Sequence, residues 1–458
     1  MYKLLYKISL TAGLLCLLLT GFLPGQTEEN TKSFTLENGL KIYLFEKHNL
    51  PLVNMVFAFD VGSKDETAET SGLVHILEHY ILFRGTEART GDQISRDIRS
   101  HGAYFNAHTG RDLSLFELSL PSEYIDFGLA NQKEILFNLN LTQENLDKEK
   151  EVILEEISNT EDDPDRYPLT LLFNSLYGDH PYHRPVYGNR EVISGATVEQ
   201  METFYRKFFV PANAALAVVG DFDIAEMENR IRKTFSDIPA GEKPVETYPM
   251  VEPIKKTLEI THTMDTNKAY MVIGTLGPDY NNMDQYTLDV LSLILGGGIN
   301  PMLNSVLRGQ RRLVDTVRMG FGAERYGGAI TVLMTLDKKT MKAAQRQAVD
   351  FLKSTRSLNY SLDDFQGDQR LYATDFMENA KNQIRFSYYQ SQENGLNIAS
   401  SLARYILMNT LPDRGRYLDR IDDISPGDLR KAAAEYLSKS KYVIVSIQPQ
   451  ADKREKTP

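Results

Sequence analysis

The segment Ser71–Thr86 (SGLVHILEHYILFRGT) carries the residues with the clearest chemistry, His75, Glu78 and His79. If the segment is helical, the two histidines lie four residues apart on one face, where both imidazoles can bind one metal ion. Glu78 projects onto nearly the same face, so a carboxylate would stand beside the metal and its water. Two imidazoles and a carboxylate suit Zn²⁺, and a hydrolytic zinc site keeps one position open for water. The pattern therefore predicts a zinc site that needs a third protein ligand.

An acidic segment downstream, 143–160, is the place where we expect that ligand. Its apolar residues recur among charged ones with the period of a helix. Glu149 and Glu156 are seven residues apart, which is two turns on one face, whereas Glu155 points about 100° away from Glu156. An acidic helix is usually just a solvated face, so the segment alone does not prove a ligand.

The N-terminal residues, 1–25, have the features of an export signal. Lys3 and Lys7 precede an apolar run from Ile8 to Leu23, and a polar segment follows. The run is short and interrupted for a membrane-spanning helix, and an uncleaved anchor is the alternative. We therefore predict an exported protein, periplasmic or extracellular in a bacterium, that contacts a membrane only through an uncleaved N-terminus.

Composition limits the classes of partner and of chemistry. The single cysteine, Cys16, lies in the predicted signal, so the mature chain would have neither a disulfide nor a thiol ligand. The formal net charge of -11 argues against a nucleic-acid partner, because phosphates need a basic surface. With 42% hydrophobic residues among 458, the chain can bury ample core and should form at least two domains.

The mature chain shows two similar halves, predicted as domains at 31–240 and 254–450, joined by a linker at 241–253 that is rich in proline, glycine and charge. In the first half we expect strands within 33–47, 50–66, 103–121 and 215–221, and helices at 71–86, 91–101, 123–139, 143–160 and 198–208. In the second half we expect strands at 256–263, 268–277, 326–336 and 441–448, and helices at 284–295, 339–353, 362–382 and 426–437. Each half ends on a helix and then a strand, which indicates a duplicated α+β fold whose antiparallel-rich sheets are backed by helices. The helix at 284–295 has no histidine, so only the first half can hold the metal.

These features resemble the pitrilysin-like zinc peptidases with the inverted motif H-x-x-E-H, the inverzincins, and among them the two-domain branch related to mitochondrial processing peptidase. The resemblance covers nearly everything after the signal. Besides the histidine segment it rests on the blocks ENGL (37–40), GS (62–63), NAHT (106–109), PANAALAVVGDF (211–222), LGGGINPML (295–303) and LRGQRRLVD (307–315). It implies that the two domains form half of a clam-shell chamber.

The resemblance also implies roles for the acidic and basic side chains. His75, His79 and Glu156 would hold one Zn²⁺ per chain. Glu78 would be the general base that takes a proton from water and passes it to the leaving amine. Glu149 would orient a ligand or support the charge balance beside the metal.

Asn106 lies in the segment that forms an exposed edge strand in relatives, against which a peptide substrate is bound as an added strand. The alternative for Asn106, which the sequence leaves equally open, is a turn residue before Thr109.

Two features depart from the family pattern. Between His79 and Gly85 the chain has one residue more than the common form, so the end of the helix is expected to differ. Active members also carry an arginine and a tyrosine seven residues apart that stabilise the substrate's developing oxyanion. Arg308 matches the arginine, but Asp315 stands in place of the tyrosine, and its charge would oppose an oxyanion.

Three functions follow as hypotheses. The first is an exported zinc endopeptidase for peptides or unfolded polypeptides. It would be the zinc-bearing subunit of a hetero-oligomer whose homologous partner supplies the Arg–Tyr pair, with a homodimer as the alternative assembly. The second is a weakly active or inactive scaffold or binding subunit of a peptidase complex, which Asp315 favours. The third is a metal-binding or storage protein, which would need ligands filling the open position.

Overall fold

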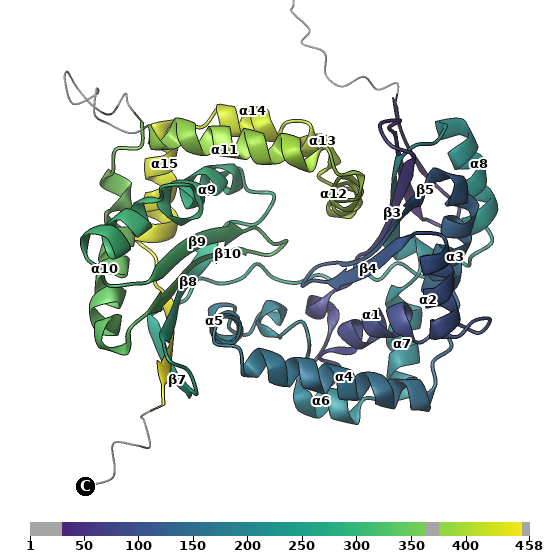
Figure 1. The fold of residues 1–458 in the computed structure, drawn as a ribbon, viewed down its shortest axis with the longest axis horizontal. Helices are drawn as coiled ribbons and strands as arrows, with labels where there is room; N and C mark the ends of the chain where they lie inside the picture. The colour runs from purple at the N-terminus through teal and green to yellow at the C-terminus, as the bar shows by residue number, and fades with distance from the viewer. Residues whose placement is uncertain (1–29, 362–363, 365–374, 451–458) are drawn as a thin grey trace, which may run out of the picture.

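The computed structural model describes residues 30–361, 364 and 375–450. They form two halves, each built on one β-sheet with helices packed on it, which lie side by side in Figure 1. The first half runs from purple to teal and the second from green to yellow. The predicted signal, residues 1–25, lies outside the described residues. Within them, no helix has the length and apolar character needed to cross a membrane.

The first sheet has six strands, and the predicted strand segments of the first half all contribute to it. They are β1 (Thr31–Thr35), β2 (Lys41–Glu46), β3 (Leu52–Phe59), β4 (Tyr104–Thr109), β5 (Ser114–Pro121) and β6 (Ala214–Gly220). Their order across the sheet is β1-β2-β6-β3-β5-β4. β6 runs parallel to β2, and all other neighbours are antiparallel. Among the described strands β4 pairs only with β5, so it forms one edge of this sheet.

The second sheet repeats this plan with five strands. They are β7 (Leu258–Met264), β8 (Ala269–Gly277), β9 (Thr316–Gly322), β10 (Gly328–Leu336) and β11 (Val443–Pro449). Their order is β7-β11-β8-β10-β9, and only β11 and β7 run parallel. The last strand of this half, β11, lies between β7 and β8, and the last strand of the first half, β6, lies between β2 and β3 in a similar way. The predicted α+β fold with two antiparallel-rich sheets is therefore confirmed.

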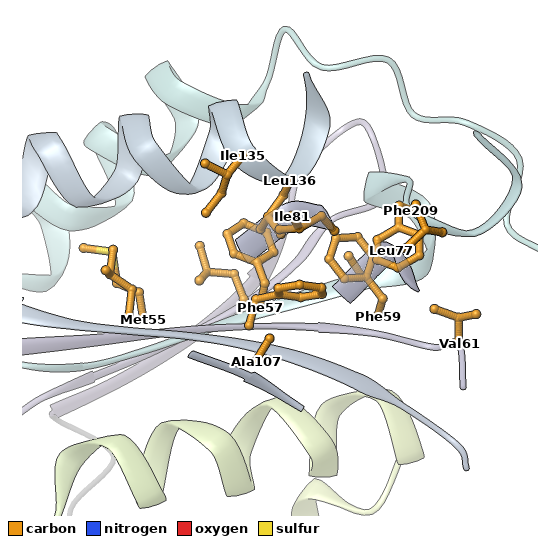
Figure 2. Close-up of a cluster of buried hydrophobic side chains, with 14 of the residues drawn as sticks. Met55, Phe57, Phe59, Val61, Leu77, Ile81, Ala107, Ile135, Leu136 and Phe209 are labelled. Atoms are coloured by element: carbon orange, nitrogen blue, oxygen red, sulfur yellow. The ribbon is translucent and has the colours of Figure 1, made fainter. Parts of the chain in front are cut away.

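The main core of the first half lies between its sheet and the helices on one face. The helices of this half are α1 (Leu73–Phe83), α2 (Gly91–Ser100), α3 (Ile125–Phe137), α4 (Gln143–Glu161), α5 (Tyr167–Leu176), α6 (Arg190–Gly195), α7 (Val198–Phe208) and α8 (Ile224–Phe235). Met55, Phe57 and Phe59 of β3 join this core, whereas Val56 and Ala58 face the opposite side, because successive strand residues alternate. Figure 2 shows side chains of β3 meeting those of α1 and α3 in this core.

The remaining helices belong to the second half of the chain. These are α9 (Asp284–Ser292), α10 (Met341–Ser354), α11 (Phe376–Ser391), α12 (Gly395–Met408), α13 (Leu411–Arg414), α14 (Tyr417–Asp422) and α15 (Pro426–Ala432), with π-helical turns η6 (Leu293–Gly297), η7 (Asn304–Gln310) and η12 (Ala433–Ser438). The helix predicted at 362–382 is described only in its last part. There α11 begins at Phe376, because the Asp375 side chain accepts the N–H of Glu378 and caps the helix.

Each sheet has its second face covered by a helix from the opposite half, an exchange that the sequence did not predict. Leu402 of α12 packs with Val56 on the first sheet, and Leu172 of α5 packs with Val272 on the second. In Figure 1, α12 accordingly lies beside β3 and α5 beside β8. Apolar burial therefore joins the two halves.

A polar cluster joins the halves where the turn between β9 and β10 reaches the first half. The Arg325 guanidinium donates to Asp60 Oδ1 at 2.8 Å, and the Arg325 N–H donates to Asp112 Oδ2 at 2.9 Å. The Tyr182 hydroxyl donates to the other oxygen of Asp112 at 2.6 Å. These buried and partly buried hydrogen bonds add a geometric constraint to the apolar contacts.

The predicted linker, 241–253, runs without a helix or strand between α8 and β7. It is nevertheless tied to both halves. The Tyr248 hydroxyl donates to Asp65 at 3.2 Å, and the Val251 N–H donates to the carbonyl of Tyr326 at 2.8 Å.

Candidate metal centre

Helix α1 begins at a tightly packed N-terminus. Gly72 has φ +101°, and a Cβ there would lie 2.8 Å from Gly188 Cα, so only glycine fits without strain. The buried Glu66 carboxyl accepts the backbone N–H of Gly72 at 2.8 Å and that of Val74 at 2.9 Å. Burial raises the pKa of Glu66 to about 8, although these two donors act against the shift. Glu66 therefore caps the helix that carries both histidines.

Helix α1 ends at Phe83, and the residue after it closes the last turn. The Arg84 N–H donates to the Tyr80 carbonyl, and Gly85 follows with φ +96°. A Cβ at Gly85 would lie 2.4 Å from the carbonyl oxygen of Arg89. The helix is thus regular up to Phe83, and Arg84 and Gly85 close its C-terminal turn.

His75, His79 and Glu156 come together as the sequence predicts. His75 Nε2 lies 3.7 Å and His79 Nε2 lies 3.6 Å from Glu156 Oε2, and the three ligand atoms all lie within 4.8 Å of one another. Two ligand atoms bound tetrahedrally to one zinc ion stand about 3.3 Å apart, given metal–ligand distances near 2 Å. The three side chains therefore fit one zinc ion after small adjustments. The Glu156 side chain is 44% exposed, which leaves the site open to solvent on that side.

Helix α4 places Glu149 two turns before Glu156, and the two carboxylates have different partners. The Glu149 side chain is 1% exposed, and its Oε2 accepts Nδ1–H of His79 at 3.2 Å. Its other oxygen, Oε1, accepts Nε–H of Arg84. His79 therefore directs its Nε2 toward Glu156 while Glu149 holds the opposite side of the ring.

The two imidazoles titrate differently because their surroundings differ. Burial, and then the nearby His79, lowers the pKa of His75 to about 3, so its ring is neutral and free to bind a metal. Burial also opposes charge on His79, but the hydrogen bond to Glu149 and the charges of Glu156 and Glu149 outweigh it and raise its pKa.

Glu78 lies next to this group without belonging to the set of ligand atoms. Its side chain is buried, and burial raises its pKa, while Thr109, His79 and His108 act in the opposite direction. A carboxyl group with a raised pKa beside a metal and water suits a general base.

Asn106 lies inside β4, so the alternative of a turn residue before Thr109 is wrong. The strand pairs with β5 through Asn106 and Glu117, which gives it extended backbone rather than a turn. The Asn106 side chain donates to the Tyr104 hydroxyl at 3.0 Å.

Arg308 and Asp315 lie in the second half. Arg308 is exposed on η7. Asp315 precedes β9 and pairs with Lys268 at 3.0 Å. Within the described residues, no hydrogen bond or ion pair joins either side chain to the histidine group. The structure thus brings together five of the seven predicted site residues and Asn106 on a neighbouring strand, and leaves Arg308 apart.

Two residues that support the site, Glu66 at the start of α1 and Arg84 at its end, were not predicted from the sequence. Glu66 precedes the helix by seven residues, and no spacing rule marks it as a cap. Arg84 follows His79 by five residues, but its partner Glu149 is 65 residues away in the chain. Only the folded chain reveals that pair.

Comparisons with known proteins agree with the fold and show the family. The family model described as "Insulinase (Peptidase family M16)" matches residues 41–190, and "Peptidase M16 inactive domain" matches 195–371. An "uncharacterized zinc protease" of Rickettsia felis is 27% identical over 421 residues, which cover 88% of this chain and 99% of that protein. Another zinc protease so named, from Rickettsia bellii, is 31% identical over 289 residues, covering 61% of this chain and 67% of that protein.

Solved structures show the same fold. A protease from Helicobacter pylori superposes with a TM-score of 0.81 at 22% identity, covering 92% of this chain and 99% of that chain. A peptidase M16 inactive domain from Pseudomonas fluorescens has a TM-score of 0.80 at 20% identity, with the same coverage. Fold and sequence together define a two-domain member of a peptidase class. The chain belongs to peptidase family M16, the insulinase family, as the inverted motif predicted, and its relatives are named zinc proteases.

Proposed function

We propose that this chain is an exported zinc endopeptidase that hydrolyses peptides or unfolded polypeptides. The observation that carries the proposal is the convergence of His75, His79 and Glu156, with Glu78 on the same helix beside them. The neutral state of His75 and the open side at Glu156 fit a metal site that keeps a position free.

Zn²⁺, when bound, supplies the Lewis acidity that polarises a peptide carbonyl and makes water acidic enough to react near neutral pH. The chain's own groups provide the proton transfers. Glu78 accepts the proton of the attacking water and delivers it to the leaving amine. Its burial raises its affinity for the proton it must carry between these two steps.

Substrate binding is assigned to the free edge of β4. An extended peptide can add to this edge as a further strand, with its backbone paired to that of β4. Asn106 stands in the middle of the strand, where its side chain can contact such a peptide. Tyr104, which holds the Asn106 amide, keeps it in place before substrate arrives.

Three carboxyl variants of the full chain test the roles at the metal. Glu78→Gln should keep zinc and lower peptide cleavage by about 10²–10⁴-fold, because it removes a proton carrier and not a ligand. Glu156→Gln should lose zinc and activity together. Glu155→Gln is the matched control, since this exposed neighbour points away from the group, and it should keep both. Zinc content by mass spectrometry and cleavage of a quenched peptide library are the measurements. Equal zinc loss in the Glu78 and Glu156 variants would contradict the assignment.

We further propose that activity depends on a homologous partner subunit that supplies an Arg–Tyr pair, the two chains enclosing a chamber. Support comes from Asp315, which carries a negative charge paired with Lys268 where the family pattern has a tyrosine. The purified chain should bind zinc but cleave peptides weakly until the partner is added. A fully active homodimer or monomer would refute this and make Asp315 a tolerated change. Zinc without activity, even with the partner present, would instead support an inactive scaffold subunit.

Export is part of the same proposal and rests on residues 1–25 alone. Fractionation of a bacterial host that expresses the full chain should place the protein outside the cytoplasm. Mass spectrometry of its N-terminus would show whether the signal is cleaved or retained as a membrane anchor.

A further inference from the structure

We propose that Arg84 is a positioning residue of the metal site, which acts through Glu149 to fix the His79 ring and thereby strengthens metal binding. This inference deepens the proposed function and rests on it, because it assumes that the histidine group binds zinc.

The geometry is a chain of contacts that starts at Arg84 and ends at the metal ligands. Arg84 Nε–H donates to Glu149 Oε1, and His79 Nδ1–H donates to Glu149 Oε2 at 3.2 Å. His79 Nε2 then lies 3.6 Å from Glu156 Oε2. Each oxygen of Glu149 has its own partner, so the plane of the carboxylate is set by Arg84 and His79 together.

Burial makes this support necessary. The Glu149 side chain is 1% exposed and that of Arg84 is 23% exposed. A buried carboxylate without a cationic partner is costly and relaxes by moving or by taking up a proton. In either case it would no longer hold the Nδ1–H of His79.

The two helices of the site are also tied by this contact. Arg84 and His79 belong to α1 and its cap, whereas Glu149 and Glu156 belong to α4. The Glu149 carboxylate therefore fixes α4, and with it the third ligand, relative to both histidines. His75 has no comparable support, since its Nδ1 is buried with no hydrogen-bond partner among the described residues.

Two effects of Arg84 on a metal dication have opposite signs, and this makes the inference testable. Its positive charge repels the metal and would weaken binding. Its support of a ligand-orienting carboxylate strengthens binding, and the loss of such support typically costs about 10–100-fold in metal affinity. We expect positioning to dominate, because the guanidinium charge is already offset by Glu149.

The experiment measures the zinc Kd of the full chain by competition with a chelator, for unaltered protein and Arg84→Gln. The variant should bind zinc about 10-fold more weakly. With Co²⁺ in place of zinc, its visible absorption bands should shift, because the ligand geometry changes. Arg84→Lys keeps the charge and reaches the same carboxylate, so it should recover most of the affinity. Thermal melts of the metal-free variants check that each is folded.

A double-mutant cycle tests whether Arg84 acts through Glu149. In a Glu149→Gln background, Arg84→Gln should change the zinc Kd by less than about 2-fold, because the carboxylate that it positions is gone. Arg190→Gln is the matched control. Arg190 pairs at 2.6 Å with Glu161, an exposed residue of α4, the helix that also carries Glu149. The Arg190→Gln substitution should leave the zinc Kd and the cobalt spectrum unchanged.

The outcomes separate this inference from the proposed function. If unaltered protein binds no stoichiometric zinc, the proposed function fails and this inference fails with it. If unaltered protein binds zinc but Arg84→Gln binds it equally or more tightly, only the positioning role is refuted. Additive losses in the cycle would also refute it, because Arg84 would then act independently of Glu149.

Discussion

The two histidines of α1 differ in their surroundings although both point to Glu156. The Nδ1 of His79 is held by Glu149, which Arg84 supports, whereas the Nδ1 of His75 has no hydrogen-bond partner among the described residues. We therefore expect zinc binding to depend more on substitutions around His79 than on substitutions around His75. Gly72 matters for a different reason. Its lack of a side chain allows the N-terminus of α1 to pack closely on residues 187–193.

At the residue scale we predict that Gly72→Ala destabilises the protein by about 2–4 kcal/mol. A side chain at φ +101° is strained, and its Cβ would overlap Gly188 and Ile193. Urea unfolding of the metal-free chain measures the effect. The matched control is Gly195→Ala, where nothing lies within 4 Å of the added Cβ, so stability should change by less than about 1 kcal/mol. Similar effects in both variants would refute the role of Gly72.

At the scale of elements, α1 is fixed at both ends before it meets α4. Glu66 accepts two N–H groups at its start, and Arg84 and Gly85 end it in a closed turn. Between these ends, Ile76, Leu77 and Ile81 are fully buried in the core. The metal ligands therefore sit on a rigid helix.

The Glu66 cap predicts a specific pH dependence of stability. Its pKa in the folded protein is about 8, above the value near 4.3 of an unfolded glutamate, so the folded state binds more protons between these values. Its contribution to stability is therefore fully present below about pH 4 and decreases as the pH rises toward 8. Glu66→Gln should flatten this decline in urea unfolding of the metal-free chain. The exposed neighbour Glu69, changed to Gln, should not. An unchanged slope in Glu66→Gln would contradict the prediction.

At the scale of the whole molecule, the two halves exchange helices, so part of the core on each sheet comes from the opposite half. α12 covers the first sheet and α5 covers the second, and Arg325 adds hydrogen bonds to Asp60 and Asp112. The halves should therefore unfold cooperatively rather than as independent domains.

This exchange predicts that Leu402→Ala weakens the first sheet, although Leu402 lies in the second half of the sequence. The fully buried side chain packs on β3 and β6, so its truncation should cost about 2–5 kcal/mol and increase amide hydrogen exchange in both strands. The control is Phe386→Ala on α11, which is 68% exposed and should leave that exchange unchanged. Faster exchange confined to the second half would show that the halves are independent.

The sequence predicted the two helices of the site and most of the strands because these depend on local spacing, whereas helices α5, α8 and α12 were not predicted. Helix geometry places His75 and His79, four residues apart, on one face, and likewise Glu149 and Glu156, seven residues apart. Strand geometry sends alternate side chains to opposite faces of a sheet. The family resemblance, and not spacing, predicted that Glu156 joins the two histidines, and the folded chain does bring the three side chains together.

Tertiary structure alone decided what depends on contacts between distant segments. Arg84 meets Glu149, Asn106 falls inside an edge strand, and α12 crosses to the opposite sheet, and each requires the chain path in three dimensions. An arginine or an amphipathic helix has the same local pattern whichever carboxylate or sheet it meets. Its partner is selected by burial and charge in the folded chain, which no spacing in the sequence encodes.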